Sequence, residues 1–295
     1  MKVEIASEEE LEYLDKMLKT LNFDISVSMA YIKRAQGLSF KELSKRFSNM
    51  SESALKRYMQ QSYSAMRPIH VVAAYSWVTM VPMTSIYYGL KIREAYRGMD
   101  HDAVEAIICI GRMPTTEFNM ILQIIYSFLN EKSKSEVDTL RATLIETYGD
   151  LDNYRDSDFL PPDVLDVDRF AEDYYRSIAI TSKRFRMDNE LTMDTMAKVL
   201  GLSHYQYRIL EKEDDPKPFS MSIGVRVKLG FKIDSHVSFT KEMTSYPEFH
   251  NLRISQHIRD MLIVESMRHL PKARKKPVIN ILKELSKAYF ESPKF

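Results

Sequence analysis

Basic side chains gather in the first quarter of the chain, where they could bind phosphate or read a nucleic-acid base. Residues 31–67 contain eight Lys or Arg against two Glu, although the whole 295-residue chain has a net charge of only +1. Lys56 and Arg57 stand side by side in this region, and either could donate to the O6 and N7 acceptors of guanine. A second group of side chains that could donate or stack comprises His204, Tyr205 and Arg208.

Residues suited to catalysis or metal binding form no comparable group. The sequence contains no GxxxxGK[ST], GxGxxG, HExxH or GxSxG motif. His250 and His257 could share a helix face, but no third ligand is evident beside them. Cys109 is the single cysteine, which excludes an internal disulfide and a cysteine-based metal cluster. We therefore predict that the chain is not an enzyme and has no catalytic residue, metal ion or cofactor.

The second group of donors lies within a segment, residues 191–213, whose spacing predicts two short helices joined by a tight turn. Thr192 is suited to cap the first helix, and Gly201 can adopt the left-handed conformation that ends it. Ser203 with Gln206 makes a capping box for the second helix. The residues expected to form the shared core are Met193, Met196, Ala197, Leu202, Tyr207 and Leu210. This layout is typical of a helix-turn-helix, and its alternative is any helical hairpin with a glycine turn.

The segment resembles the helix-turn-helix domains of the Cro and phage-repressor (XRE-like) class. The resemblance covers about 60 residues, from Lys183 to Met243. It depends on the order of small, polar and apolar residues in Leu191-Thr192, Met196-Ala197, Leu200-Gly201-Leu202-Ser203 and Ile209-Leu210-Glu211. It implies DNA binding, with the second helix lying in the major groove.

Residues 24–90 repeat the pattern about 152 positions earlier. The run Gly37-Leu38-Ser39-Phe40-Lys41-Glu42-Leu43-Ser44 resembles the start of the same unit, with Ser39 and Ser51 as helix caps. Here the pair Ser48-Asn49 replaces the usual turn glycine, and the turn is expected to carry one extra residue. Trp77 and Leu229 then fall at the same place on a following apolar helix. The chain is therefore predicted to hold two tandem units.

The resemblance implies a role for residues near the start of each second helix. The residues expected to face DNA bases are Ser53, Lys56, Arg57, His204, Tyr205 and Arg208. Those expected to hold phosphates are Lys33, Arg34, Ser39, Ser51, Arg186, Thr192 and Ser203. The alternative for each cation is an ordinary solvated helix face. Residues 182–217 have as many acidic as basic residues, so the second unit lacks the positive excess of the first. Glu211, if near the DNA backbone, would repel phosphate.

The amino-acid composition and the positions of Gly and Pro predict the fold class and the divisions of the chain. Only eight Gly and eleven Pro, with many Leu, Ile, Lys, Glu and Met, predict an all-α fold of two repressor-like helix-turn-helix units, each followed by extra packing helices. The predicted divisions are residues 1–97 (an N-terminal helix and the first unit), 98–148 (a helical connector), 149–168 (an acidic linker), 169–245 (the second unit) and 246–295 (a C-terminal helical segment).

Several of these segments have two open interpretations. The N-terminal helix could pack on its own domain or on a second copy. Residues 101–131 include a helix that is apolar almost all round, which is expected either in the core or in an oligomer interface. The acidic linker could be a solvated hinge or a segment that competes with DNA for a basic face. The last two helices could build a dimer contact or pack on their own domain.

The sequence thus predicts a cytoplasmic, sequence-specific regulator of transcription that binds double-stranded DNA, with a homodimer as the expected assembly and no membrane segment. One alternative is a helical adaptor or antitoxin-like protein that binds another protein through the same surfaces. A third is a ligand-sensing regulator whose helices at 101–131 enclose a small molecule. The operator, the effector, and the choice between activation and repression are not encoded in any pattern we recognise.

Overall fold

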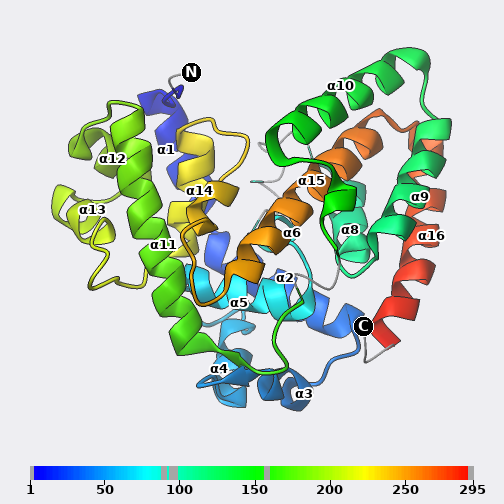
Figure 1. The fold of residues 1–295 in the computed structure, drawn as a ribbon. Helices are drawn as coiled ribbons and strands as arrows, with labels where there is room; N and C mark the ends of the chain where they lie inside the picture. The colour runs from blue at the N-terminus through cyan, green and yellow to red at the C-terminus, as the bar shows by residue number, and fades with distance from the viewer. Residues whose placement is uncertain (1–2, 88–91, 93–98, 156–159, 292–295) are drawn as a thin grey trace.

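A computed structural model describes residues 3–87, 92, 99–155 and 160–291. Nearly every element in this part of the chain is a helix, and the predicted all-α fold is confirmed (Figure 1). The only named strands here are two short ones, β1 (Phe47–Ser48) and β2 (Leu165–Asp166), which pair in parallel. Among the described residues, no helix combines the length and apolar character needed to cross a membrane.

The first unit consists of consecutive helices that match the predicted pattern. Their bounds are α2 (Leu21–Ala35), α3 (Phe40–Lys45), α4 (Glu52–Tyr58), α5 (Ile69–Thr79) and α6 (Met83–Tyr87). The apolar spacing of this unit predicts a core of seven residues. Five of them are buried and two are half-buried: Ile32, Leu43, Phe47, Met50 and Leu55, and then Leu38 and Tyr58. The sequence also predicts a helix over residues 83–97, and its part beyond Tyr87 lies outside the described residues, apart from position 92.

The second unit repeats this arrangement. It consists of α11 (Val167–Asp188), α12 (Met193–Leu200), α13 (His204–Leu210), α14 (Met221–Gly230) and a 3₁₀ turn, η3 (Val237–Thr240). Of the predicted core, Met196, Ala197, Tyr207 and Leu210 are buried, whereas Met193 and Leu202 are half-buried. Helices α4 and α13, and likewise α5 and α14, begin 152 residues apart, so the predicted period extends through both units.

The turn before α4 differs from its counterpart for a physical reason. Asn49 has a φ of 62° and stands 152 residues before Gly201, whose φ is 66°. Asparagine therefore takes the left-handed position that glycine fills in the second unit. Helix α3 ends at Lys45, earlier than the matching residue of α12, because Phe47–Ser48 is drawn into the strand pair with Leu165–Asp166.

The remaining helices form a second layer beside the two units. This layer contains α8 (His101–Ile110), α9 (Thr115–Ser127), α10 (Glu131–Tyr148), α15 (Pro247–His269) and α16 (Lys272–Glu291). Helix α15 lies at the centre and packs against α8, α9, α10 and η3 (Figure 1). The sequence predicts a long amphipathic helix over residues 249–270. The helix is present, but it is not amphipathic: polar residues such as Arg253 and Asp260 are buried too, because neighbours cover α15 on nearly every side.

Helix α9 is covered on one side only. Ile121, Leu122 and Ile125 are buried, as expected for a core helix. The opposite side carries the exposed apolar residues Met120, Ile124 and Phe128, and the neighbouring helix α16 adds Ile281 and Leu285. Contact between Arg274 and the Phe128 ring, 4.9 Å from its centroid, joins the start of α16 to the end of α9. The helix is therefore neither fully buried nor fully exposed within this chain.

The acidic linker is not a free hinge at its described ends. A 3₁₀ turn, η1 (Leu151–Asn153), follows α10, and Leu151, Leu165 and Val167 are buried. These apolar residues alternate with acidic ones, so the segment can bury one side while its carboxylates stay in water. The expectation of a solvated, extended hinge is therefore wrong for these residues.

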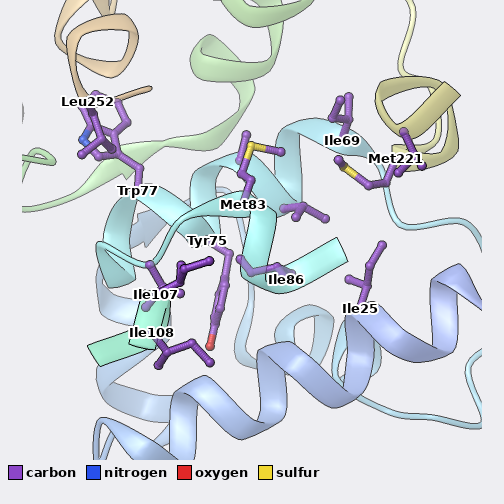
Figure 2. Packing of buried hydrophobic residues seen from close by; sticks show 14 of the residues in the cluster. Ile25, Ile69, Tyr75, Trp77, Met83, Ile86, Ile107, Ile108, Met221 and Leu252 are labelled. Carbon is purple, nitrogen blue, oxygen red and sulfur yellow. The ribbon is translucent and has the colours of Figure 1, made fainter. Parts of the chain in front are cut away.

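The core is continuous across the units and the second layer. Tyr75 of α5 reaches α2, where its hydroxyl donates to the Met29 carbonyl at 2.7 Å, and Ile107 and Ile108 of α8 lie close by (Figure 2). Trp77 of α5 packs against Phe249 of α15, with ring centroids 5.3 Å apart and the rings tilted by 50°. Burial of this much apolar surface fixes the second layer to both units.

Candidate nucleic-acid interface

In the first unit, two capped helices present one exposed face. The Ser39 hydroxyl accepts from the Glu42 amide at 3.1 Å, and the Glu42 carboxylate accepts from the Ser39 amide at 2.8 Å, which completes a capping box. The Ser51 hydroxyl accepts from the Ala54 amide at 3.2 Å and starts α4. Leu55 anchors α4 inward, so the opposite face points to solvent. Ser39 and Ser51 thus cap helices α3 and α4 whether or not they also bind phosphate.

The exposed face of α4 carries Ser53, Lys56 and Arg57, the three residues predicted to face bases. Lys56 is bound to Glu52 one turn earlier, with 2.6 Å between Nζ and Oε1, but its side chain is still 54% exposed. An exposed pair of this kind contributes little free energy, so a phosphate or base could displace Glu52 at small cost.

The two predicted phosphate contacts near the end of α2 differ in their surroundings. Arg34 is exposed. Lys33 is half-buried: its Nζ donates to the Leu38 carbonyl at 3.0 Å and lies 4.6 Å from the centroid of the Phe40 ring. Lys33 therefore helps to fix the connection between α2 and α3, and Arg34 is the freer cation of the two.

The second unit shows the predicted caps and turn. Thr192 accepts from the Thr195 amide at 3.1 Å, and Ser203 forms a capping box with Gln206. Gly201 cannot be replaced without displacing a neighbour, because an added Cβ would lie 2.8 Å from Cζ of Arg226. These contacts hold α12 and α13 at a fixed crossing.

Helix α13 exposes the predicted residues His204, Tyr205 and Arg208. Tyr205 is 62% exposed, which is unusual for so large an aromatic side chain. The Arg208 guanidinium lies 5.7 Å from the centroid of the Tyr205 ring, so the two side chains form one surface that is both aromatic and cationic. His204 is held by Asp194, with 2.6 Å between Nδ1 and Oδ1.

Arg186 has a different position from the one that the sequence predicts. Its guanidinium donates twice to Glu211, at 2.7 and 3.0 Å, and Glu211 also accepts from the Tyr207 hydroxyl at 2.5 Å. The hydrogen bonds to Glu211 raise the pKa of Arg186. Arg186 thus links α11 to the end of α13, which corrects the prediction that it holds a phosphate. Glu211 is turned inward, so it does not face phosphate.

The two units differ in how far carboxylates neutralise their exposed cations. In the second unit, exposed cations pair with carboxylates: Lys183 with Glu213 at 3.9 Å, and Lys217 with Asp215 at 2.5 Å. Arg184 likewise meets Glu242 at 2.7 Å. In the first unit, Lys41, Lys45 and Arg57 are exposed around α3 and α4. Of the eight cations in residues 31–67, Arg67 is buried and Lys33 and Arg46 are half-buried, whereas the other five are exposed. Most of the predicted positive excess of the first unit therefore lies on its surface.

Other chemically competent residues lie away from both helix pairs. His269 contacts Glu136 at 3.0 Å and Glu265 at 2.9 Å, a group that sequence reasoning missed because Glu136 comes from α10 whereas the other two come from α15. Arg268 also binds Glu265, so an ion-pair network accounts for the group. His250 accepts or donates a bond with Thr240 at 2.9 Å, and His257 lies against the Tyr148 ring. The two histidines thus contact different partners.

Comparison with known proteins returned no match among family models, curated proteins or solved structures.

Proposed function

We propose that the chain binds double-stranded DNA through α4 and α13 and regulates transcription by doing so. The observation that carries this proposal is that the same capped helix pair occurs in both units. Two helix pairs have the same caps, a left-handed residue in the same place, and a second helix whose first turns are exposed. Helices presented in this way fit the major groove, where donors can read base edges.

The charges support the same proposal. Arg34, Lys41, Lys45 and Arg57 surround the first helix pair, and a positive surface of this kind is what the phosphate backbone attracts. In the second unit, Arg208 and Tyr205 offer a donor and a stacking surface. Ser51, Ser203 and the amides of the first turns stand where phosphates are usually held.

Fluorescence anisotropy with a labelled random duplex at two salt concentrations tests the proposal. If each unit neutralises about three phosphates, raising the salt from about 50 mM to about 200 mM should weaken binding by about 10³. Binding that is absent, or that ignores salt, would overturn the proposal.

A specific observation favours one competing function. The cations of the second unit are largely matched by carboxylates, and Tyr205 stands exposed, as interface aromatics do. In this second candidate, α13 binds a protein and α4 alone binds DNA. Substitution Arg208→Ala with Tyr205→Ala would then leave DNA affinity unchanged, whereas the main proposal expects it to fall.

A further inference from the structure

The two units meet through a reciprocal contact, in which equivalent residues of each unit make the same hydrogen bond to the other. The segments just before α5 and α14 form an antiparallel bridge between Pro68 and Ser220. The Ile69 amide donates to the Phe219 carbonyl at 3.0 Å, and the Met221 amide donates to the Arg67 carbonyl at 3.2 Å. Residues 69 and 221 occupy the same place in the two units, and so do residues 67 and 219. Each unit therefore gives the other the hydrogen bond that it receives.

Side chains at this contact follow the same reciprocity. Ile69 and Met221 begin α5 and α14, and they lie on facing elements (Figure 2). Gly224 allows the close approach, because a Cβ there would lie 3.1 Å from Cδ1 of Ile69. A self-complementary contact between two equivalent bodies is the mark of a twofold axis.

Each unit also contacts the segment that precedes the other unit, although these contacts are not at equivalent positions. The segment before α11 lies on the first unit, where Arg46 donates to the Asp163 carbonyl at 2.8 Å and β2 pairs with β1. The segment before α2, including α1 (Glu8–Leu18), lies on the second unit, where the Ala6 amide donates to the Gly230 carbonyl at 2.9 Å. Lys198, which stands 152 residues after Arg46, binds Glu8 of this segment at 2.5 Å.

We infer that a local twofold axis relates the two units and that one chain reads a whole inverted repeat, with α4 on one half-site and α13 on the other. This inference rests on the proposed function and deepens it, because it specifies the arrangement of the DNA. A twofold axis places α4 and α13 at equal distances from it. In Figure 1, none of α9, α10 and α16 is drawn between α4 and α13.

The repeat should be imperfect, because the exposed faces of the two helices differ. The pairs of residues at equivalent positions are Glu52 and His204, Ser53 and Tyr205, Lys56 and Arg208, and Arg57 and Ile209. The spacing should be fixed, because the bridge and the shared core hold the units as one body. We expect about 10 base pairs between the centres of the half-sites, because major grooves on one face of the duplex repeat at each helical turn.

Grafting one recognition face onto the other makes the orientation measurable. The variant His204→Glu, Tyr205→Ser, Arg208→Lys, Ile209→Arg gives α13 the exposed face of α4. The reciprocal variant, Glu52→His, Ser53→Tyr, Lys56→Arg, Arg57→Ile, does the opposite and serves if the first fails to fold. Each full-length variant, and the unchanged chain, is used to select duplexes from a random pool.

We expect each grafted variant to select a palindrome, whereas the unchanged chain selects two unlike half-sites. Five base pairs inserted between the halves should reduce affinity to that of a single half-site, because they turn one half to the opposite face. Two identical half-sites in direct orientation, a single half-site, or tolerance of the insertion would overturn the inference and leave DNA binding intact. Selection of no duplex by any of the three proteins would overturn the proposed function, and this inference with it.

Discussion

At the scale of single residues, Glu211 links α13 of the second unit to the rest of the fold. Its carboxylate is buried among Arg186 and Tyr207, and both of them donate to it. Removing it would leave a half-buried guanidinium without its counter-charge. Glu211→Ala should therefore lower the free energy of unfolding by about 2–3 kcal/mol, measured by urea denaturation.

An exposed pair between α12 and α1 provides the control. Lys198 and Glu8 are 59% and 81% exposed, so Lys198→Ala should change stability by less than about 0.5 kcal/mol. If the two variants lost equal stability, the inward position of Glu211 would not be the reason.

The ranking of the two proposed DNA faces is a second prediction about residues. Lys56→Ala with Arg57→Ala should weaken duplex binding more than Arg208→Ala, because exposed cations surround α4 whereas carboxylates match those around α13. The double variant should also reduce the magnitude of the salt slope by about 2, one for each lost cation. Lys132→Ala, on the exposed start of α10, is the control and should have no effect in the anisotropy titration. An equal or larger loss from Arg208→Ala would reverse the ranking.

Asp260 makes stability depend on pH. Burial raises its pKa to about 7 from 3.8, although nearby cations and the Thr84 hydroxyl, which donates to the carboxylate, lower it. Because the folded chain holds this proton up to about pH 7 and the unfolded chain releases it near 3.8, its contribution to stability is complete below 3.8 and is lost as the pH rises toward 7.

Asp260→Asn mimics the protonated carboxyl and keeps an acceptor for Thr84. The difference in unfolding free energy between the variant and the unchanged chain should therefore move in favour of the variant by at least about 1 kcal/mol between pH 4.5 and pH 7.5. Urea denaturation at both values measures it. A difference that stays constant, or moves the other way, would show that Asp260 titrates near its usual value.

At the scale of elements, two of the glycines with positive φ offer a matched pair. Gly37 and Gly201 have nearly equal φ values, 64° and 66°. An alanine at either position would carry the strain of that conformation, about 1–2 kcal/mol. Only at Gly201 would the new methyl group also meet Arg226, which donates to the Val199 carbonyl at 3.2 Å.

Gly201→Ala should accordingly lower the unfolding free energy by about 1 kcal/mol more than Gly37→Ala does. It should also weaken DNA binding, because the crossing of α12 and α13 depends on this turn. Thermal and urea unfolding of both variants measure the difference. Equal losses would mean that Arg226 moves aside freely.

The helix caps show how much of these elements was predictable. Ser39, Ser51 and Ser203 each stand three residues before the amide that they accept from, a local pattern that any reader of the sequence can find. The pairing of Phe47–Ser48 with Leu165–Asp166 was not predictable in this way. It joins distant segments, and the acidic neighbours of Leu165 made that stretch look like open linker.

The candidate site was predictable to the same extent. Exposure of Lys56, Arg57 and Arg208 follows from helical periodicity. The inward turn of Arg186 does not, because its partner Glu211 comes from the next helix but one, and charge alone gives both residues a place at the surface. Burial of polar residues along α15 was missed for a related reason: periodicity cannot show that other helices cover both faces.

At the scale of the whole molecule, the exchanged segments make the two units one body. Each unit is held by the segment that leads into the other, through the contacts of Arg46 with residue 163 and of Ala6 with Gly230. One chain therefore contains what two copies of a single-unit chain would have to assemble. The homodimer expected from the sequence stays a prediction, for which the exposed apolar residues of α9 and α16 are where we would look first.

Site-directed cleavage of DNA tests most directly whether α4 and α13 lie on one duplex. The only cysteine, Cys109, is buried, so Ser53→Cys or Tyr205→Cys provides one accessible thiol for an iron chelate that cuts nearby DNA. We predict cuts from both positions on the same selected duplex, centred about 10 base pairs apart, and none from the control Met120→Cys on α9. Cleavage from neither position, or from only one of them, would contradict the account.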